Sequence, residues 1–484
     1  MAGRSPMPQP ALPLHTKLAY GFGSVAFGIK DNGFAFLLLL YYNQVLGLPE
    51  RWVGLAIMLA LIVDAVSDPV VGYASDHLHS RWGRRHPFMY AAAVPVGIAY
   101  YLLWSPPSGL SQEALFAYFL TVAILVRTLI TFYEIPSSSL VAELTDQYNE
   151  RTSILGFRYF FGWWGGLTMA VLAFAVFLQA SPAHPVGVLN PDGYRTYGLV
   201  AAVLMTLAIL ISAAGTHSYI PHLRQPPTTR ATSIAAVLRE MRETLANPSF
   251  LALFATGIFA AMAGGLIAAL NVYFSTFFWE LTSGEIALLV VANFASAAAA
   301  LVIAPRLSAR YGKRAAALRM ALAASVIGPA PVILRLLDAF PANHSPALLP
   351  TLLVANTVVV TLIILTSILV SSMVADVVED SELSTGRRSE GVFFAANSFV
   401  QKTVSGIGIF ASTLLLGAIG FPAGAKPGEV EPEVVRNLGR VYVPLLMLLY
   451  GAAVFCLSRY RITPAGHEAT LARLAQRALS ERVD

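Results

Sequence analysis

The chain of 484 residues is too apolar and too poor in charge to form a soluble protein. Hydrophobic residues make up 56% and charged residues 12%, against roughly 45–50% and 25% in ordinary soluble proteins. The apolar residues come in long blocks, so the mean hydropathy of +0.65 indicates membrane spans rather than one large core. The single cysteine, Cys456, excludes an intrachain disulfide and a cysteine-based metal site.

Twelve membrane helices are predicted, because apolar stretches of about 20 residues alternate with charged or Pro- and Gly-rich segments. Residues 1–17 are rich in proline and contain no apolar signal segment, so we expect a cytoplasmic tail. The predicted spans cover residues 18–48, 51–78, 86–106, 112–142, 153–180, 196–220, 249–279, 284–305, 314–336, 347–376, 390–419 and 438–459.

The distribution of Lys and Arg over the short loops predicts the orientation of the chain. The loop after the second span and the loop after the eighth are both strongly basic, and we expect basic loops to face the cytoplasm. An even number of spans puts both termini on that side, as in a bacterial-type plasma (inner) membrane. The net charge of +5 therefore reflects orientation, and nucleic-acid binding is not needed to explain it.

An internal repeat predicts two halves. The segment 81–85 (RWGRR) follows the second span, and the similar segment 310–314 (RYGKR) follows the eighth. Residues 222–248 form a polar linker with an amphipathic stretch, Ile234 to Leu245, between bundles at 18–221 and 249–460; residues 461–484 form a second cytoplasmic tail. This pattern resembles the major facilitator fold: an all-α membrane protein of two six-helix halves, with a central site and alternating access.

Charges next to the basic loops are candidates for a gate. We expect ion pairs at the cytoplasmic ends of the spans; the alternative is a solvated loop whose charges only orient the helices. The gate candidates are Asp76, Arg84, Arg85, Arg310, Arg314, Asp376 and Asp380.

The few ionisable residues inside the spans are the main candidates for function, because a charge at membrane depth costs about 2.5–3.5 kcal/mol. Asp64 and Asp68 are four residues apart, so both carboxylates project from one helix face. A cation, a shared proton or a basic group would relieve their repulsion. Ser67 and Thr131 are candidates for additional oxygen ligands. The alternative is an interhelical ion-pair network that carries no ion.

Span four carries a polar stripe of Arg127, Thr131 and Glu134, and Pro136 is expected to break the helix just beyond it. We expect Glu134 to bind the hydroxyls of a ligand or, alternatively, to form a structural pair with Arg158. Further candidates for substrate binding are Lys30, Asp31, Ser138, Trp163, Ser398 and Lys402, with aromatic rings available to stack on sugar faces.

These residues resemble the glycoside-pentoside-hexuronide:cation symporters, the melibiose permease family. The resemblance follows nearly the whole chain and is most specific in the Asp64 to Pro69 segment. Its other parts are Lys17 to Gly23, the loop from Ser80 to Gly83, the Ile135-Pro136 turn and the segment that ends in Lys402.

The resemblance implies roles for the intramembrane residues. It makes Asp64, Asp68, Ser67 and Thr131 the cation site, and it assigns Glu134, Arg158, Ser398 and Lys402 to sugar binding. It implies no enzyme activity and no cofactor, but a small-molecule substrate, Na⁺ or H⁺ as coupling ion, a lipid bilayer around the chain, and a monomer.

Several positions depart from that family. Its Lys-Asp pair aligns with Phe27 and Gly28, one turn before Lys30 and Asp31. Ser138 stands where the family has a stacking tryptophan, which favours a relative of another kind, the sodium-dependent lysophospholipid transporters, as the alternative. The family has a basic residue at the position of Leu61, one turn before the aspartates. Arg127, on another span, can substitute for it. If Arg127 reaches Asp64 or Asp68, proton coupling is favoured over sodium coupling.

Overall fold

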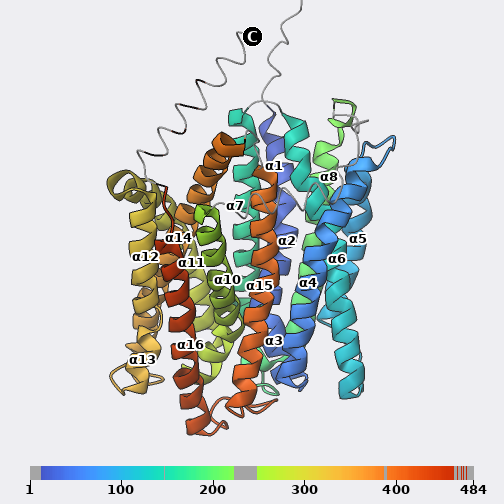
Figure 1. Cartoon of the computed structure of the whole chain (residues 1–484). Coiled ribbons are helices and arrows are strands. Elements are labelled where there is room, and N and C mark those ends of the chain that lie inside the picture. Colours follow the sequence, from blue (N-terminus) through green and yellow to red (C-terminus); the bar gives the residue numbers. More distant parts are fainter. Residues whose placement is uncertain are drawn as a thin grey trace, which may run out of the picture. The chain divides into compact units, whose positions relative to one another are not determined.

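The computed structural model contains helices and no strand among the residues that it describes (Figure 1). These are residues 12–145, 148–222, 248–385 and 390–462, with Gly466, Thr470, Arg473 and Gln476. In some helical stretches, mainly 378–382 and 390–400, the side chains are not described. The predicted linker helix from Ile234 to Leu245 and most of both tails therefore lie outside the described residues.

The chain divides into two compact units, and the first contains the helices before the linker. The short segments Thr282–Ala287 and Ala423–Ala425 are also assigned to it. In unit 1 the helices are α1 (Leu14–Phe22), α2 (Ser24–Asn32), η1 (Gly33–Leu37), α3 (Leu38–Leu40), η2 (Tyr41–Val45), α4 (Glu50–His77), α5 (His86–Leu103), α6 (Gln112–Leu144), α7 (Tyr148–Leu172), η3 (Ala173–Phe177), η4 (Gly187–Leu189), α8 (Pro191–His217) and η5 (Ile220–His222).

Unit 2 contains the remaining described helices, apart from the first residues of α11. They are α10 (Pro248–Tyr273), η6 (Phe274–Phe278), α11 (Ser283–Tyr311), α12 (Lys313–Ile327), α13 (Ala330–Leu336), α14 (Leu348–Thr385), α15 (Glu390–Ala418) and α16 (Pro432–Ser458).

Each predicted span corresponds to a helix or to a run of consecutive helices. Among the described residues, eleven helical segments are long and apolar enough to cross a membrane. The remaining predicted span, 390–419, coincides with the 29 residues of α15. The all-helical membrane fold with twelve spans is thus confirmed, and helix ends differ from the predicted ones by a few residues. The largest difference is α14, which continues to Thr385.

One local prediction is wrong: Pro136 does not break its helix. α6 runs through this proline to Leu144. Proline removes only one backbone donor, and a membrane helix tolerates the loss when side chains or neighbouring helices satisfy the freed carbonyl.

The predicted repeat appears in the backbone of both units. Gly83 and Gly312, the central residues of the two basic loops, have φ of 72° and 75°, a conformation that favours glycine because it has no Cβ. The first helical run of each unit also ends in a π-helical turn, where Leu46 N donates to Tyr41 O and Trp279 N to Phe274 O. Matching turns at matching places indicate two copies of one structural plan.

Close helix packing positions the polar residues of unit 1. α2 packs against α7, and α4 packs against α6. At the first contact, Gly28 leaves no room for a Cβ because the carbonyl oxygen of Gly162 lies there, as is typical of membrane helices that pack through small residues. At the second contact, Asp64 on α4 and Arg127 on α6 face each other.

Candidate functional site

A buried ion pair joins α4 and α6 in unit 1. Asp64 is 0% exposed, and its Oδ2 accepts a hydrogen bond from Arg127 Nη1 at 2.9 Å. The guanidinium of Arg127 also lies over the ring of Phe34, 4.4 Å from the ring centre. Arg127 therefore reaches the aspartate pair, which is the condition under which the sequence favoured proton coupling.

Thr131 joins the two aspartates. Its Oγ1 lies 3.0 Å from Asp64 Oδ1, 3.2 Å from Asp68 Oδ1 and 3.0 Å from the carbonyl oxygen of Arg127. A hydroxyl group has one hydrogen to donate, so it serves one of these acceptors at a time. Both carboxylates thus lie on one face of α4, toward α6, as their spacing predicted.

Ser67 forms a hydrogen bond within its own helix. Its Oγ donates to the backbone carbonyl of Asp64 at 2.9 Å, so its hydrogen is directed along its own helix. Its oxygen is still a potential acceptor. Among the described residues no group of three or more His, Cys, Asp or Glu is arranged to hold a metal ion.

A second charged group contains Lys30, Asp31 and Glu134. Lys30 on α2 is 1% exposed, and its Nζ lies 2.9 Å from Asp31 Oδ1 and 3.6 Å from Glu134 Oε2. Asp31 is 56% exposed, so this group extends from a buried ammonium to an accessible carboxylate. Carboxylates and an ammonium at membrane depth can bind the hydroxyls of a polar solute.

Arg158 does not form the predicted alternative pair with the Glu134 carboxylate. It donates to the Glu134 backbone carbonyl at 3.3 Å, to Ser137 Oγ at 3.0 Å and to the Tyr20 hydroxyl at 3.3 Å. Its guanidinium also lies over the Phe27 ring, 4.9 Å from the centre. Arg158 therefore ties α1, α6 and α7 together beside the charged group.

Two other predicted substrate residues, Ser138 and Trp163, have exposed side chains. Ser138 is exposed and donates to the Ile135 carbonyl within α6. Trp163 on α7 is 53% exposed.

The gate candidates of unit 1 converge on Glu143, which the sequence analysis missed. Arg84 Nη2 and Arg85 Nε lie 2.6 and 3.1 Å from Glu143 Oε1. Arg85 also pairs with Asp76 at 2.5 Å and donates to Ser75 Oγ at 2.8 Å. The signal that could have found Glu143 is its position at the end of α6, where that end meets the basic loop.

Unit 2 has a corresponding pair. Lys313 Nζ lies 2.5 Å from Asp376 Oδ1, so the basic loop binds the end of the second span after it, as in unit 1. Arg314 donates to the Ser458 carbonyl at 2.6 Å, and Arg310 lies over the Tyr311 ring. These contacts fasten the loop within the unit.

Two predicted positions lie partly outside the described residues. The backbones of Asp380 and Ser398 are helical, but their side chains are not described. Lys402 is half-buried on α15 and belongs to unit 2.

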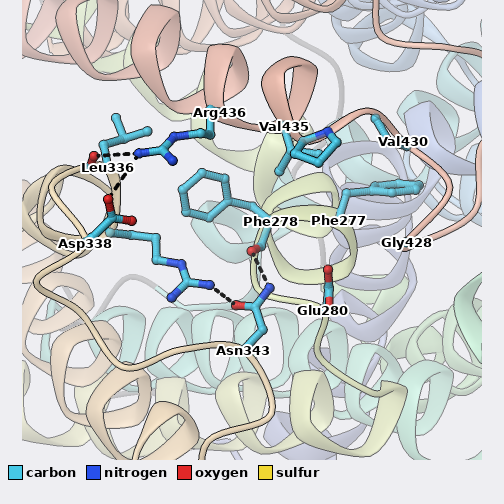
Figure 2. A pocket seen from close by; sticks show the side chains of 12 residues that line it. Phe277, Phe278, Glu280, Leu336, Asp338, Asn343, Gly428, Val430, Val435 and Arg436 are labelled. Atoms are coloured by element: carbon cyan, nitrogen blue, oxygen red, sulfur yellow. Dashed lines mark hydrogen bonds and ion pairs between the residues drawn. The ribbon is translucent and has the colours of Figure 1, made fainter.

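A separate hollow of roughly 400 Å³ lies among the loops of unit 2 (Figure 2). Arg335 donates to Asn343 Oδ1 at 3.0 Å and to the Pro341 carbonyl, and Asn343 donates to the Phe278 carbonyl. Arg436 donates to the Leu336 carbonyl at 3.2 Å. These arginines hold the loop after α13 in place.

Comparison with known proteins identifies the family. Residues 19–464 match the family model described as MFS/sugar transport protein. The chain belongs to this family. The predicted resemblance to glycoside/cation symporters is confirmed by relatives of that description, and the members are membrane transporters.

Three relatives cover nearly the whole chain. The putative glycoside/cation symporter YagG of Escherichia coli is 23% identical over 95% of this chain and 94% of its own. The isoprimeverose transporter of Lactiplantibacillus pentosus is 26% identical over 95% and 92%. The mouse sphingosine-1-phosphate transporter MFSD2B is 26% identical over 91% and 88%.

A solved structure supports the fold. The crystal structure of a D-xylose-proton symporter aligns with a TM-score of 0.60 at 16% identity, over 91% of this chain and 96% of that one. The major facilitator fold is therefore shared, and the chain is a multi-pass membrane transporter.

Proposed function

We propose that this transporter is a symporter that couples import of a small glycoside or sugar derivative to a cation, and that the cation is a proton. The observation that carries the choice of ion is the Arg127 guanidinium, 2.9 Å from Asp64 Oδ2. The proposal includes alternating access, no cofactor, and a monomer in a bacterial-type inner membrane with both termini in the cytoplasm.

The arginine disfavours a metal cation for an electrostatic reason. A sodium ion at the aspartate pair would be repelled by the positive charge of Arg127 a few ångströms away. The opposite charges of Arg127 and Asp64 already attract each other there. A proton needs only one carboxylate oxygen. We assign it to Asp68, because Asp64 already has the Arg127 guanidinium as its counter-charge at 2.9 Å.

The second charged group supports a hydroxylated substrate. Lys30, Asp31 and Glu134 offer both donors and acceptors at membrane depth, and the isoprimeverose transporter and the glycoside/cation symporter are relatives over nearly the full chain. Asp68 and Glu134 stand on neighbouring helices on either side of Thr131. Protonation of Asp68 thus changes the charge next to the proposed sugar-binding residues.

The alternative is an amphiphile such as a lysolipid. It is favoured by the similarity to the sphingosine-1-phosphate transporter and by Ser138 in place of the stacking tryptophan. This substrate would bring an anionic headgroup to the same charged residues.

Counterflow in proteoliposomes tests the substrate class without any ion gradient. We expect exchange of labelled isoprimeverose or a related glycoside, no exchange of lysophosphatidylcholine or sphingosine-1-phosphate, and at least a tenfold loss of sugar exchange in Glu134→Gln, since a charged hydrogen bond contributes about 1.5–3 kcal/mol. The matched control is Glu113→Gln at the exposed start of α6. Exchange of lysolipid alone would contradict the sugar assignment.

A further inference from the structure

A second cavity of unit 2 is lined mainly by helices. It has a volume of roughly 160 Å³ and is lined by α10, η6, α11, α14 and α16, with the junction of α12 and α13. Its polar lining residues are Asn271, Ser275, Asn356 and Tyr442, and Trp279 adds an indole ring. Nothing in the sequence analysis pointed to these residues.

This cavity lies at membrane depth. Asn343, just before α14, donates to the Phe278 carbonyl, so the end of η6 and the start of α14 lie at the same face of the unit. Asn271 precedes Phe278 by seven residues and Asn356 follows Leu348 by eight. At a rise of 1.5 Å per residue, both amides lie about 10–12 Å from that face of the unit. Polar groups at that depth need a partner or water.

Several of these groups lack such a partner within the described part of the chain. Tyr442 is 8% exposed and Ser275 4%, yet neither hydroxyl has a hydrogen-bond partner among the described residues, and the amide of Asn271 has none either. Asn356 donates to Asn293 Oδ1 at 3.0 Å and to the Leu289 carbonyl at 3.4 Å, which leaves its own carbonyl oxygen to accept. Donors and acceptors thus converge on one small space.

The chemistry of the lining selects an uncharged, hydroxylated ligand. Among the described residues that line this cavity there is no Asp, Glu, Lys, Arg or His, so a phosphate or carboxylate would enter without a counter-charge, which is costly. An acyl chain would leave the amides and hydroxyls unpaired. Amides with an aromatic ring beside them suit a sugar ring.

We infer that this cavity is a sugar-binding site in which Asn271, Asn356 and Tyr442 hydrogen-bond to the hydroxyls of one uncharged ring. The inference rests on the proposed sugar transport and adds an uncharged site in unit 2 to the charged residues of unit 1. Trp279 lies on the wall of this cavity and is 6% exposed. Its fluorescence therefore reports whether the site is occupied.

Tryptophan fluorescence of the purified full chain, titrated with isoprimeverose, tests the inference. We expect a saturable change in the wild type that disappears in Trp279→Phe. Asn271→Leu and Tyr442→Phe should each weaken sugar affinity roughly tenfold, since each leaves a sugar hydroxyl unpaired. Tyr442→Phe keeps the ring packed against Phe274, 4.6 Å between ring centres, and so preserves the fold.

The control variant is Thr361→Val on α14, whose hydroxyl bonds only to the Thr357 carbonyl of its own helix; it should bind sugar as the wild type does. Wild-type affinity in Asn271→Leu and Tyr442→Phe, with loss in Glu134→Gln, would overturn this site and leave sugar transport standing. A wild type that responds to sphingosine-1-phosphate and to no sugar would overturn both.

Discussion

Asp64 is the residue whose environment decides most of the mechanism. It is fully buried, and its charge is balanced by Arg127 on a different helix. Removing one partner of a buried pair typically costs about 3–5 kcal/mol, because the remaining charge is uncompensated, whereas removing both is often tolerated. We therefore expect the pair to act as a lock between α4 and α6.

Arg127→Met should test this lock. We expect the variant to lose thermal stability in sodium-free buffer, and to recover part of it when NaCl replaces choline chloride, because Na⁺ can then occupy the place of the guanidinium charge. The double variant Asp64→Asn with Arg127→Met should be more stable than Arg127→Met and indifferent to sodium. Thermal unfolding in detergent measures this, and a single variant as stable as the wild type in both salts would refute the lock.

Sequence reasoning succeeded where chemistry is local and missed partners that come from other elements. The i, i+4 spacing of Asp64 and Asp68 was enough to predict a shared face, and membrane depth marked Arg127 and Lys30 as exceptional. Glu143 lies near the end of a predicted span, where a charge is ordinarily solvated. Its role follows only from the fold, which places the basic loop beside it. The alternative pair of Arg158 with the Glu134 carboxylate is replaced by a contact of that carboxylate with Lys30 from a third helix, which spacing along the chain does not indicate.

At the scale of helices, small residues hold the bundle of each unit together. α10 packs against α15 in unit 2 as α2 packs against α7 in unit 1. A Cβ on Gly265 would collide with the Ser405 carbonyl oxygen, and one on Gly408 would collide with that of Met262. Close contact of two backbones is possible only because both positions are glycine.

Gly265→Ala should destabilise the second unit. The added methyl group meets the backbone of α15, which cannot move aside as a flexible side chain would, so we expect a loss of about 1–3 kcal/mol, as for overpacked cores. The adjacent Gly264→Ala has open space around its Cβ and should be neutral or slightly stabilising, since alanine favours helix. Thermal unfolding of the two variants side by side distinguishes packing from propensity; equal melting temperatures would contradict the contact.

The whole molecule repeats one plan with different chemistry in its two units. Both have a basic loop with a central glycine, a π-helical turn that ends the first span, and a basic residue paired with an acidic one at the end of a later span. The repeat and the twelve spans could be predicted from hydropathy and from the two loop motifs. The uncharged cavity of unit 2 could not, because single Asn, Ser and Tyr residues in apolar spans carry no sequence pattern.

Uptake of labelled isoprimeverose by proteoliposomes under imposed gradients tests the proposed proton coupling most directly. We predict accumulation when the outside is acidic, no accumulation from an inward sodium gradient at equal pH, and loss of accumulation in Asp68→Asn with counterflow retained. Accumulation driven by sodium alone, or undiminished proton-driven accumulation in Asp68→Asn, would contradict it.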